Sequence, residues 1–323
     1  MCCVAGPQDL LPRIREHLRE YVSHLPDYTC RVTIDRSTRR SARAELEFVD
    51  RLRLEVAYTG GNELYAWPGS EAFESSIEEL LPAHGLVSNG SYAIHIRTLF
   101  LHDVTSFGEP RTSGGHIALD ASVPAVLSGF SLTTGAGSVP AGIDATLWLD
   151  PTSLDLERLQ VRVVTRLAQS VETTTYGRDR VGEVEFVLPQ TSELVLTDRG
   201  GMQFRNVSRF DQYHRFAGTS TISFGPGADT PAKPAAAVAK KESIRPAAKI
   251  AGTLDAAIGA DAAIGDPFTV TAEGGAKLTG RLTDMRREGR ENWYLELTLM
   301  GRAERRTGRL PIPAGTKLTW GKM

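Results

Sequence analysis

The chain has 323 residues, of which 41% are hydrophobic and 24% charged, a length and composition typical of a soluble globular protein with two domains. Its formal net charge of −2 is unevenly spread: the residues from Pro226 onward hold 16 Lys+Arg and 11 Asp+Glu, and the remainder holds 21 and 28. This mild basic excess does not indicate a nucleic-acid partner, and the 3 cysteines cannot form a disulfide framework. No run of about 20 apolar residues exists, so the sequence predicts no transmembrane helix.

An amphipathic helix is expected over residues 8–24, where apolar side chains recur at the helical period. Pro12 is tolerated there because it lies in the first turn, and Pro26 ends the helix. The start of the chain carries neither the basic region nor the apolar region of a secretory signal. Two interpretations stay open: a cytoplasmic chain, or a start that lies inside a longer precursor whose signal is trimmed.

After this helix the pattern changes to period two, which predicts strands. In DRLRLEVAY, residues 50–58, leucine and valine share one face and arginine the other. The turn TGGN follows, and then a short helix is expected around Ser75 to Leu81. Long strands joined by tight turns favour antiparallel pairing. Further strands are expected at 91–107, 115–123, 127–135, 143–150, 158–167, 170–181, 183–197, 201–211 and 213–224.

The stretch ATLWLDPTSLDLERLQV, residues 145–161, predicts a hairpin. Asp150 and Pro151 fit the first two positions of a type I turn. After the turn the apolar side chains stand at even-numbered positions as far as Leu156 and at odd-numbered positions from Leu159 onward. One residue near Glu157 must therefore be absorbed, and we expect a β-bulge that bends and twists the sheet.

The composition predicts four segments along the chain. A disordered start at 1–7 precedes a main body at 8–225, and residues 226–248 form a Pro/Ala/Lys-rich linker. The linker has too few large apolar side chains to offset the entropy of ordering it. Residues 249–323 are expected to form a small β-rich module, because stretches such as NWYLELTLM alternate.

The sequence contains no recognisable catalytic framework. His84, His95 and His102 have neither a helical metal-pair spacing nor a zinc-finger spacing, and we expect His95 on a strand as a half-buried, hydrogen-bonded residue. The G-x-S-x-G elbow, the phosphate loop and the dinucleotide fingerprint are all missing. Cys30 is expected to be a buried, inert thiol. These observations predict no enzyme, no metal and no cofactor, with an unrecognised hydrolase as the remaining catalytic alternative.

The main body resembles the LolA/LolB-type lipoprotein-carrier superfamily, and within it uncharacterised acidobacterial-type envelope proteins. The features that carry the resemblance are the N-terminal helix followed by LPDYTCRVTIDR, then DRLRLEVAYTGGNELYAWPG, the hairpin above, and the closing FVLPQTSELVLTD and FRNVSRFDQYHRFAGTSTISF. The resemblance implies an α+β fold: a strongly curved antiparallel sheet, or open half-barrel, with the N-terminal helix and a short covering helix. It also implies a concave face that takes acyl chains, and export to the periplasm or cell envelope. The arginine that such carriers use as a latch has no match here.

Two functions follow as hypotheses. The first is a non-catalytic envelope protein that binds a lipid or lipoprotein acyl chain in the concave face, with Trp67, Phe130 and Trp148 as candidate contacts; each of these also fits plain core packing. The second is an interaction scaffold whose barrel is filled by its own side chains and whose basic tail docks an envelope partner. Arginines of the tail are candidate contacts to an anionic surface, or charges that keep a hairpin edge soluble. These are Arg286, Arg287, Arg290, Arg305 and Arg306.

Overall fold

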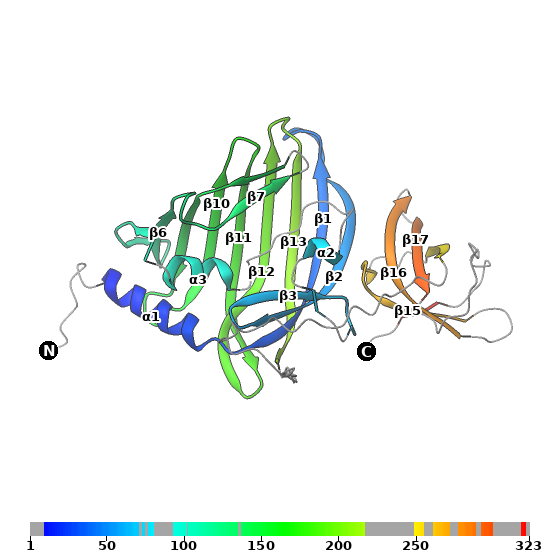
Figure 1. Cartoon of the computed structure of the whole chain (residues 1–323), viewed down its shortest axis with the longest axis horizontal. Coiled ribbons are helices and arrows are strands. Elements are labelled where there is room, and N and C mark those ends of the chain that lie inside the picture. The colour runs from blue at the N-terminus through cyan, green and yellow to red at the C-terminus, as the bar shows by residue number, and fades with distance from the viewer. Residues whose placement is uncertain are drawn as a thin grey trace, which may run out of the picture.

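The computed structural model describes residues 10–70, 73–74, 77–80, 93–101, 103–134, 137–216, 249–254, 261–271, 277–288, 292–299 and 318–320. Its main feature is an open antiparallel sheet of 11 strands with helices against one face (Figure 1). The predicted fold class, a curved α+β sheet, is confirmed. The predicted segments at 1–7 and 226–248 lie outside the described residues, and the division into domains stays a prediction.

The main sheet has the order β3-β2-β1-β13-β12-β11-β10-β9-β6-β4, and β5 pairs with β6. Nearly every neighbour in the sheet is also a neighbour along the chain, as expected for hairpin connections. The crossing from β1 to β13 brings the two ends of the main body together. The strands are β1 Tyr28–Arg39, β2 Glu47–Thr59, β3 Asn62–Ala66, β4 Ser106–Phe107, β5 Arg111–Ser113, β6 His116–Val123, β9 Ile143–Leu149, β10 Leu156–Val164, β11 Ala168–Val181, β12 Val184–Asp198 and β13 Gln203–Arg215.

Within the described ranges, three helices accompany the sheet: α1 Leu10–His24, α2 Ile77–Leu80 and α3 Ile94–Leu101. The predicted helices at the N-terminus and after the TGGN turn are confirmed by α1 and α2. The strand expected at 91–107 is wrong, because its central part is α3, and His95 lies on this helix rather than on a strand. Ala93, Ile96 and Phe100 are buried at helical spacing, and this packing decides the conformation over the β-branched composition. His84 and His102 lie outside the described residues.

The hairpin of β9 and β10 contains the predicted bulge, since its register shifts between Leu156 and Arg158. Its loop is wider than the expected type I turn. The Asp150 carbonyl accepts from the Leu154 amide at 3.0 Å, four residues on, and Leu154 has a positive φ of 63°. The Asp150 carboxylate also accepts from the amides of Thr152 and Ser153, at 2.8 and 2.7 Å, and these bonds lower its pKa.

Two other strand predictions need correction. The strand expected at 201–211 does not end there: β13, Gln203–Arg215, continues through a bulge where Gln212 has a φ of 55°. The rest of the strand expected at 213–224, from residue 217 on, lies outside the described residues. The strand expected at 127–135 is only β7, Ser131–Thr134, which pairs with β8, Gly137–Pro140, as a separate hairpin. Before it the chain turns, because the Pro124 carbonyl accepts from Leu127.

The C-terminal part forms a second antiparallel sheet of 5 strands, ordered β14-β17-β16-β15-β18. This agrees with the expected β-rich character of the tail. Its strands are β14 Lys249–Leu254, β15 Pro267–Thr271, β16 Lys277–Glu288, β17 Asn292–Leu299 and β18 Leu318–Trp320. The segment before β15 joins the main sheet, because Ile264 forms a parallel bridge to Leu52 of β2.

Candidate functional site

The inner face, defined as the sheet face that carries the buried side chains, holds two apolar clusters. One cluster lies over β6, β9 and β10, where Leu119, Leu147 and Leu159 are buried beneath α1 and α3. The other lies over β1 and β2 and includes Tyr28, Tyr58 and side chains of the C-terminal part. We call them the helix-covered cluster and the edge cluster. Alternation along each strand produces them, because every second side chain points inward.

Between the two clusters the inner face is polar. β11 places Ser170, Glu172 and Thr174 in the buried phase, between the apolar Ala168 and Tyr176. The neighbouring strands add Ser192, Asn206 and Ser208, all at most 8% exposed. These six polar residues form what we call the polar strip. Buried polar groups need hydrogen-bond partners, and the strip supplies them internally. The Ser192 hydroxyl donates to Glu172 at 2.8 Å, and Thr174 donates to Ser192 at 3.1 Å.

Helix α3 connects the polar strip with both clusters. His95 Nε2 lies 3.4 Å from the Glu172 carboxylate, and both side chains are only 7% exposed. Arg97 donates to the Tyr58 hydroxyl at 3.1 Å in the edge cluster, and Ile96 and Leu99 are buried in the helix-covered cluster. A single short helix therefore has polar contacts with the sheet on one side and apolar contacts on the other.

Helix α1 covers the other side of the helix-covered cluster through Ile14, Leu18 and Val22. Two polar contacts fix it. The Tyr21 hydroxyl donates to the Val187 carbonyl of β12, and Arg19 Nε donates to the Phe100 carbonyl of α3 at 3.1 Å. Burial raises the pKa of Tyr21, so its hydroxyl stays a donor at neutral pH.

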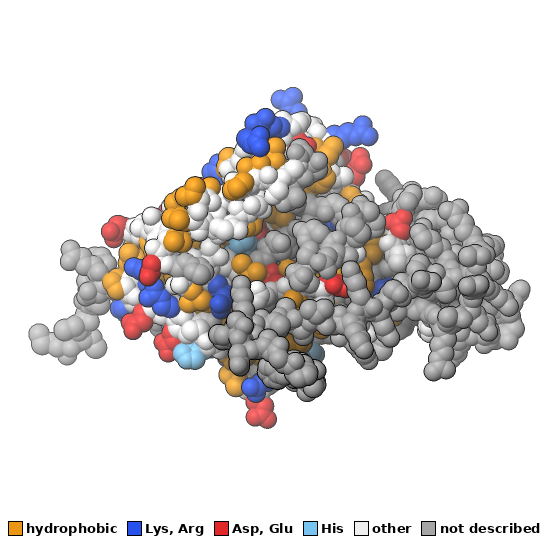
Figure 2. All heavy atoms as spheres, in the orientation of Figure 1, with side chains coloured by type: hydrophobic (Ala, Val, Ile, Leu, Met, Phe, Trp, Pro, Cys, Tyr) orange, Lys and Arg blue, Asp and Glu red, His pale blue; other side chains and the backbone are white. Residues whose placement is uncertain are grey.

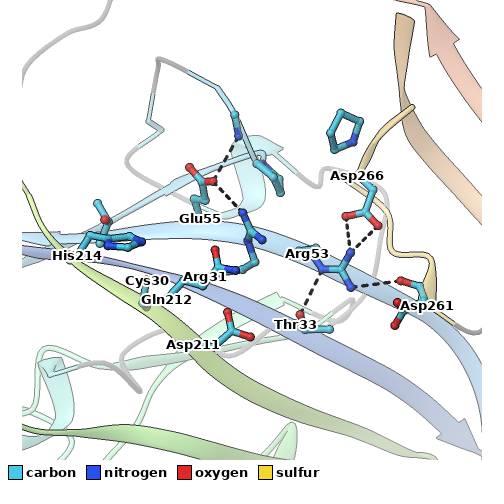
Figure 3. A pocket seen from close by; sticks show the side chains of 14 residues that line it. Cys30, Arg31, Thr33, Arg53, Glu55, Asp211, Gln212, His214, Asp261 and Asp266 are labelled. Carbon is cyan, nitrogen blue, oxygen red and sulfur yellow. Dashed lines mark hydrogen bonds and ion pairs between the residues drawn. The ribbon is translucent and has the colours of Figure 1, made fainter. Parts of the chain in front are cut away.

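A pocket of about 450 Å³ opens on the opposite, outer face, between β1, β2, β13 and the segment before β15 (Figure 3). Its walls are mainly polar and charged. Arg31, Arg53 and Glu55 come from the main sheet, and Asp261 and Asp266 from the C-terminal part. A second pocket, of about 440 Å³, also lies on outer-phase residues, along β6, β9 and β10.

Asp266 ties the two sheets together at the first pocket. Both of its carboxylate oxygens accept from Arg53 Nη1, at 2.7 and 2.6 Å, and one also accepts from the Ala263 amide at 3.0 Å. Burial raises the pKa of Asp266, and Arg53 opposes that shift. Arg281 of β16 is also partly buried here and donates to the Pro68 carbonyl at 2.9 Å; burial lowers its pKa.

Arg31 is the group in this pocket best placed to receive a ligand. Its Nη2 lies 3.6 Å from Glu55, and its buried Nε has no hydrogen-bond partner among the residues that the structure describes. Gln212, the bulge residue of the neighbouring strand β13 with positive φ, also lines the pocket. Cys30 is also among the residues at the pocket, although it is only 1% exposed. Burial raises the pKa of its thiol well above the ordinary value. The predicted burial of Cys30 is thus confirmed.

The structure does not bring the three predicted aromatic contacts together. Trp67 packs against the edge cluster, close to Gly265, and Phe130 against the helix-covered cluster, 6.2 Å from the ring of His95. Trp148 lies in the outer phase of β9, where the Arg158 guanidinium stacks 3.7 Å from its ring. Ligand contacts by these side chains stay predictions.

The predicted tail arginines are only partly within the described chain. Arg286 and Arg287 lie on β16, paired in register with Tyr294 and Trp293. Arg290, Arg305 and Arg306 lie outside the described residues. Contact of any of them with an anionic surface stays a prediction.

Sequence reasoning missed Glu172 and Asp266. The signal for Glu172 was present in QSVETTTYG, where polar residues occupy the phase that the flanking apolar residues assign to the core. Asp266 had no such signal, because its partner Arg53 is more than 200 positions away in the sequence. Among the residues that the structure describes, no three His, Cys, Asp or Glu side chains are grouped to hold a metal ion. In that same part of the chain, no helix has the length and apolarity needed to cross a membrane.

No protein-family model matches this sequence, and no curated protein matches it. Two solved structures are similar in fold. A LolA superfamily protein from Nitrosomonas europaea is 12% identical with a TM-score of 0.32, covering 62% of this chain and 91% of its own. A DUF1329 family protein from Desulfovibrio piger is 10% identical with a TM-score of 0.32, covering 67% and 96%. At these identities and TM-scores, neither similarity assigns a family or a function to this chain. The fold class follows from the sheet topology described above.

Proposed function

We propose that this chain is a non-catalytic binding protein that holds an amphipathic ligand, such as a lipid or a lipoprotein acyl chain, on the inner face of the open sheet. The ligand's apolar chain lies in the helix-covered cluster, and its polar end reaches the polar strip. The observation that carries the proposal is the division of one face into apolar and hydrogen-bonding parts, both beneath α3. Each CH₂ buried there would contribute about 0.8 kcal/mol.

Binding requires α1 and α3 to move, because side chains already fill the inner face. Leu147, Leu119 and Ile96 are all 0% exposed. The ligand therefore selects a minor open state, in which its chain replaces the helix side chains against the sheet. The polar contacts of α3, from His95 to Glu172 and from Arg97 to Tyr58, set the cost of opening.

Location in the periplasm or cell envelope is part of the same proposal. It is supported by the resemblance of residues 8–225 to envelope carriers, and by an open sheet of the kind that the resemblance implies. A carrier of acyl chains would act between membranes, where a free chain is insoluble. Cytoplasmic location remains the alternative.

The test is native mass spectrometry of the purified chain before and after solvent extraction, followed by uptake of a fluorescent fatty acid. We expect a bound lipid that extraction removes, and uptake by the extracted protein. His95→Ala should speed uptake about 5-fold, because it removes the contact of α3 with the buried Glu172 and so favours the open state.

His116→Ala is the matched control, because His116 also pairs with a glutamate, Glu157, but both side chains are more than 40% exposed. Uptake by this variant should equal that of the unaltered protein. If no lipid co-purifies and none is taken up, the ligand proposal is wrong.

A second candidate function, an interaction scaffold, is favoured by one observation. The inner-face side chains are buried by the protein itself, and both described pockets lie on the outer face. In that case the junction of the two sheets, rather than the inner face, would be the functional surface. A failed lipid-uptake experiment would favour this candidate.

A further inference from the structure

One end of the main sheet collects four chain connections from separate parts of the sequence. The register partners run along this end without interruption: Thr38 faces Glu47, Arg39 faces Gln203, Ala168 faces Asp198, Val164 faces Gln169 and Val123 faces Ile143. The connections at residues 40–46, 124–130, 165–167 and 199–202 therefore emerge side by side. We call this set the rim; its hairpins form the upper edge of the sheet in Figure 1.

Exposed apolar side chains concentrate at the rim. Among the described residues, seven large apolar side chains are exposed, and six of them lie in or next to these connections. Val126 is 88% exposed and Leu127 54%, in the turn that follows β6. The other four are Leu46, Val49, Val164 and Met202. Single exposed apolar residues are normal on a protein surface, but their collection at one end marks a contact surface.

Arginines are interspersed with these apolar side chains. Arg40, Arg43, Arg166 and Arg199 are exposed on the hairpin tips, and Figure 2 shows basic side chains along the same upper edge. The same connections contain one carboxylate, the exposed Glu45, so four arginines stand against one acidic side chain. Within the part of the chain that the structure describes, no carboxylate forms an ion pair with these four arginines. Asp198 is engaged instead with its own turn, where it accepts from the Met202 amide at 2.9 Å.

The opposite end of the sheet has the reverse character. Two of its hairpin ends, residues 150–155 and 178–185, carry Asp150, Asp155, Asp179, Glu183 and Glu185 against two arginines. One of these arginines, Arg178, is paired with Asp155 and Glu185. The sheet is therefore polarised from an acidic end to a basic, apolar end.

We propose that the rim is a docking surface for an anionic lipid bilayer. Aliphatic side chains at a turn can enter the interfacial region, and arginines around them meet lipid phosphates, each worth about 1 kcal/mol or about 5-fold in affinity. A protein partner would need a hydrophobic patch of matching shape, whereas a bilayer can accommodate apolar side chains on separate hairpin tips. This proposal does not rest on the inner-face ligand.

The experiment is co-sedimentation of the full chain with vesicles. Phosphatidylcholine vesicles are compared with vesicles containing 30% phosphatidylglycerol, at about 0.05 and 0.5 M salt. We expect binding to the anionic vesicles at low salt and little binding elsewhere. Arg40→Ala with Arg43→Ala should weaken binding about 25-fold, and Val126→Ser with Leu127→Ser at least about 10-fold.

The matched control is Arg180→Ala with Val184→Ser, at the acidic end, where Val184 is 57% exposed. This variant should bind like the unaltered protein, and all three should unfold at the same temperature because the changed side chains are exposed. Absence of binding to anionic vesicles overturns the proposal. Equal loss in the control variant, or full binding by the Val126/Leu127 variant, overturns it too. Lipid uptake is measured separately, so either proposal can fail alone.

Discussion

The two faces of β1 and β2 differ completely, although alternate residues of the same two strands form them. The inner phase holds Val32, Ile34, Leu52 and Leu54, each at most 3% exposed. The outer phase holds ion pairs, such as Asp35 with Arg51. Burying an aliphatic side chain contributes about 1.5–3 kcal/mol, whereas an exposed ion pair contributes about 0–1 kcal/mol. The inner face of these strands therefore supplies most of their contribution to stability, and the outer-face ion pairs supply less.

One ion pair breaks this division, and it gives the largest expected effect. Arg36 continues the inner phase of β1. Its Nε and Nη2 donate to the two carboxylate oxygens of Asp50 at 2.6 and 2.5 Å, and both side chains are at most 8% exposed. Asp50→Ala should destabilise the protein by about 3–5 kcal/mol, because it leaves a buried guanidinium without its carboxylate. Chemical denaturation measures this loss.

Asp35→Ala is the control for Asp50, since Asp35 pairs with arginines in the outer phase of the same strand. Asp35 is 18% exposed, compared with 8% for Asp50, so its loss should cost less, about 1–3 kcal/mol. Equal losses in the two variants would contradict the distinction between the faces.

The apolar inner phase gives the next effect. Leu54 is 0% exposed and lies opposite Val32. Leu54→Ala should cost about 2–5 kcal/mol through lost transfer energy and the cavity that remains. Val164→Ala, at a residue that is 56% exposed, should change the free energy of unfolding by less than about 0.5 kcal/mol. A small loss in Leu54→Ala would mean that the edge cluster is loosely packed.

The junction of the two sheets tests whether the outer edge is built as tightly as the core. The Ile264 amide donates to the Arg51 carbonyl at 2.7 Å, and the Arg53 amide to the Ile264 carbonyl at 2.9 Å, along the part of β2 that β3 leaves unpaired. Gly265 has a φ of 105°, and a Cβ there would lie 2.5 Å from both the Arg53 carbonyl and the Trp67 ring. Gly265→Ala should therefore cost about 1–3 kcal/mol.

Limited proteolysis locates the effect of Gly265→Ala. We expect faster cleavage between the two sheets and unchanged resistance of the main sheet. Gly182→Ala is the control, because Gly182 also has a positive φ, of 68°, but open space around its Cβ position. Equal cleavage in both variants would show that backbone strain alone, not the close approach at the junction, is responsible.

The sequence predicted the elements that depend on local pattern and missed those that depend on distant partners. Helix α1, the alternation of β1 and β2, and the bulge before Arg158 follow from spacing alone. Helix α3 was missed, because YAIHIRTLF alternates like a strand and only its packing shows the helical spacing. Gln212 was read as a strand boundary, although the bulge there leaves β13 continuous.

The candidate sites show the same limit. The aromatic residues singled out from the sequence are separated by the fold. Alternation places Trp148 on the face opposite Leu147 and Leu149, as the structure has it, whereas Trp67 had no signal for the cluster that it joins. The polar strip had a visible signal in β11, but its partner His95 was assigned to the wrong type of element. The rim was not predictable, because four hairpin tips become neighbours only through the order of the strands.

The smallest effect concerns an exposed pair on the outer face, Arg111 with Asp120. Arg111 Nη1 and Nη2 donate to the two carboxylate oxygens at 2.5 and 3.2 Å, and these bonds lower the pKa of Asp120 below its ordinary value of 3.8. A depressed carboxyl pKa adds stability that is present above the ordinary value and is lost as the pH falls below it. Arg111→Ala should therefore raise the pKa of Asp120 toward 3.8 and flatten the dependence of stability on pH in that acidic range. Stability at pH 7 should change very little, because both side chains are at least half exposed.

Thr146, which donates to Asp120 at 2.7 Å from the neighbouring strand, gives the matched variant Thr146→Val, with a smaller rise expected. NMR titration of the Asp120 carboxyl measures both shifts. A larger rise in Thr146→Val than in Arg111→Ala would mean that the hydroxyl, rather than the exposed guanidinium, controls this carboxylate, and that outer-face ion pairs are weaker still than the comparison of the two faces assumes.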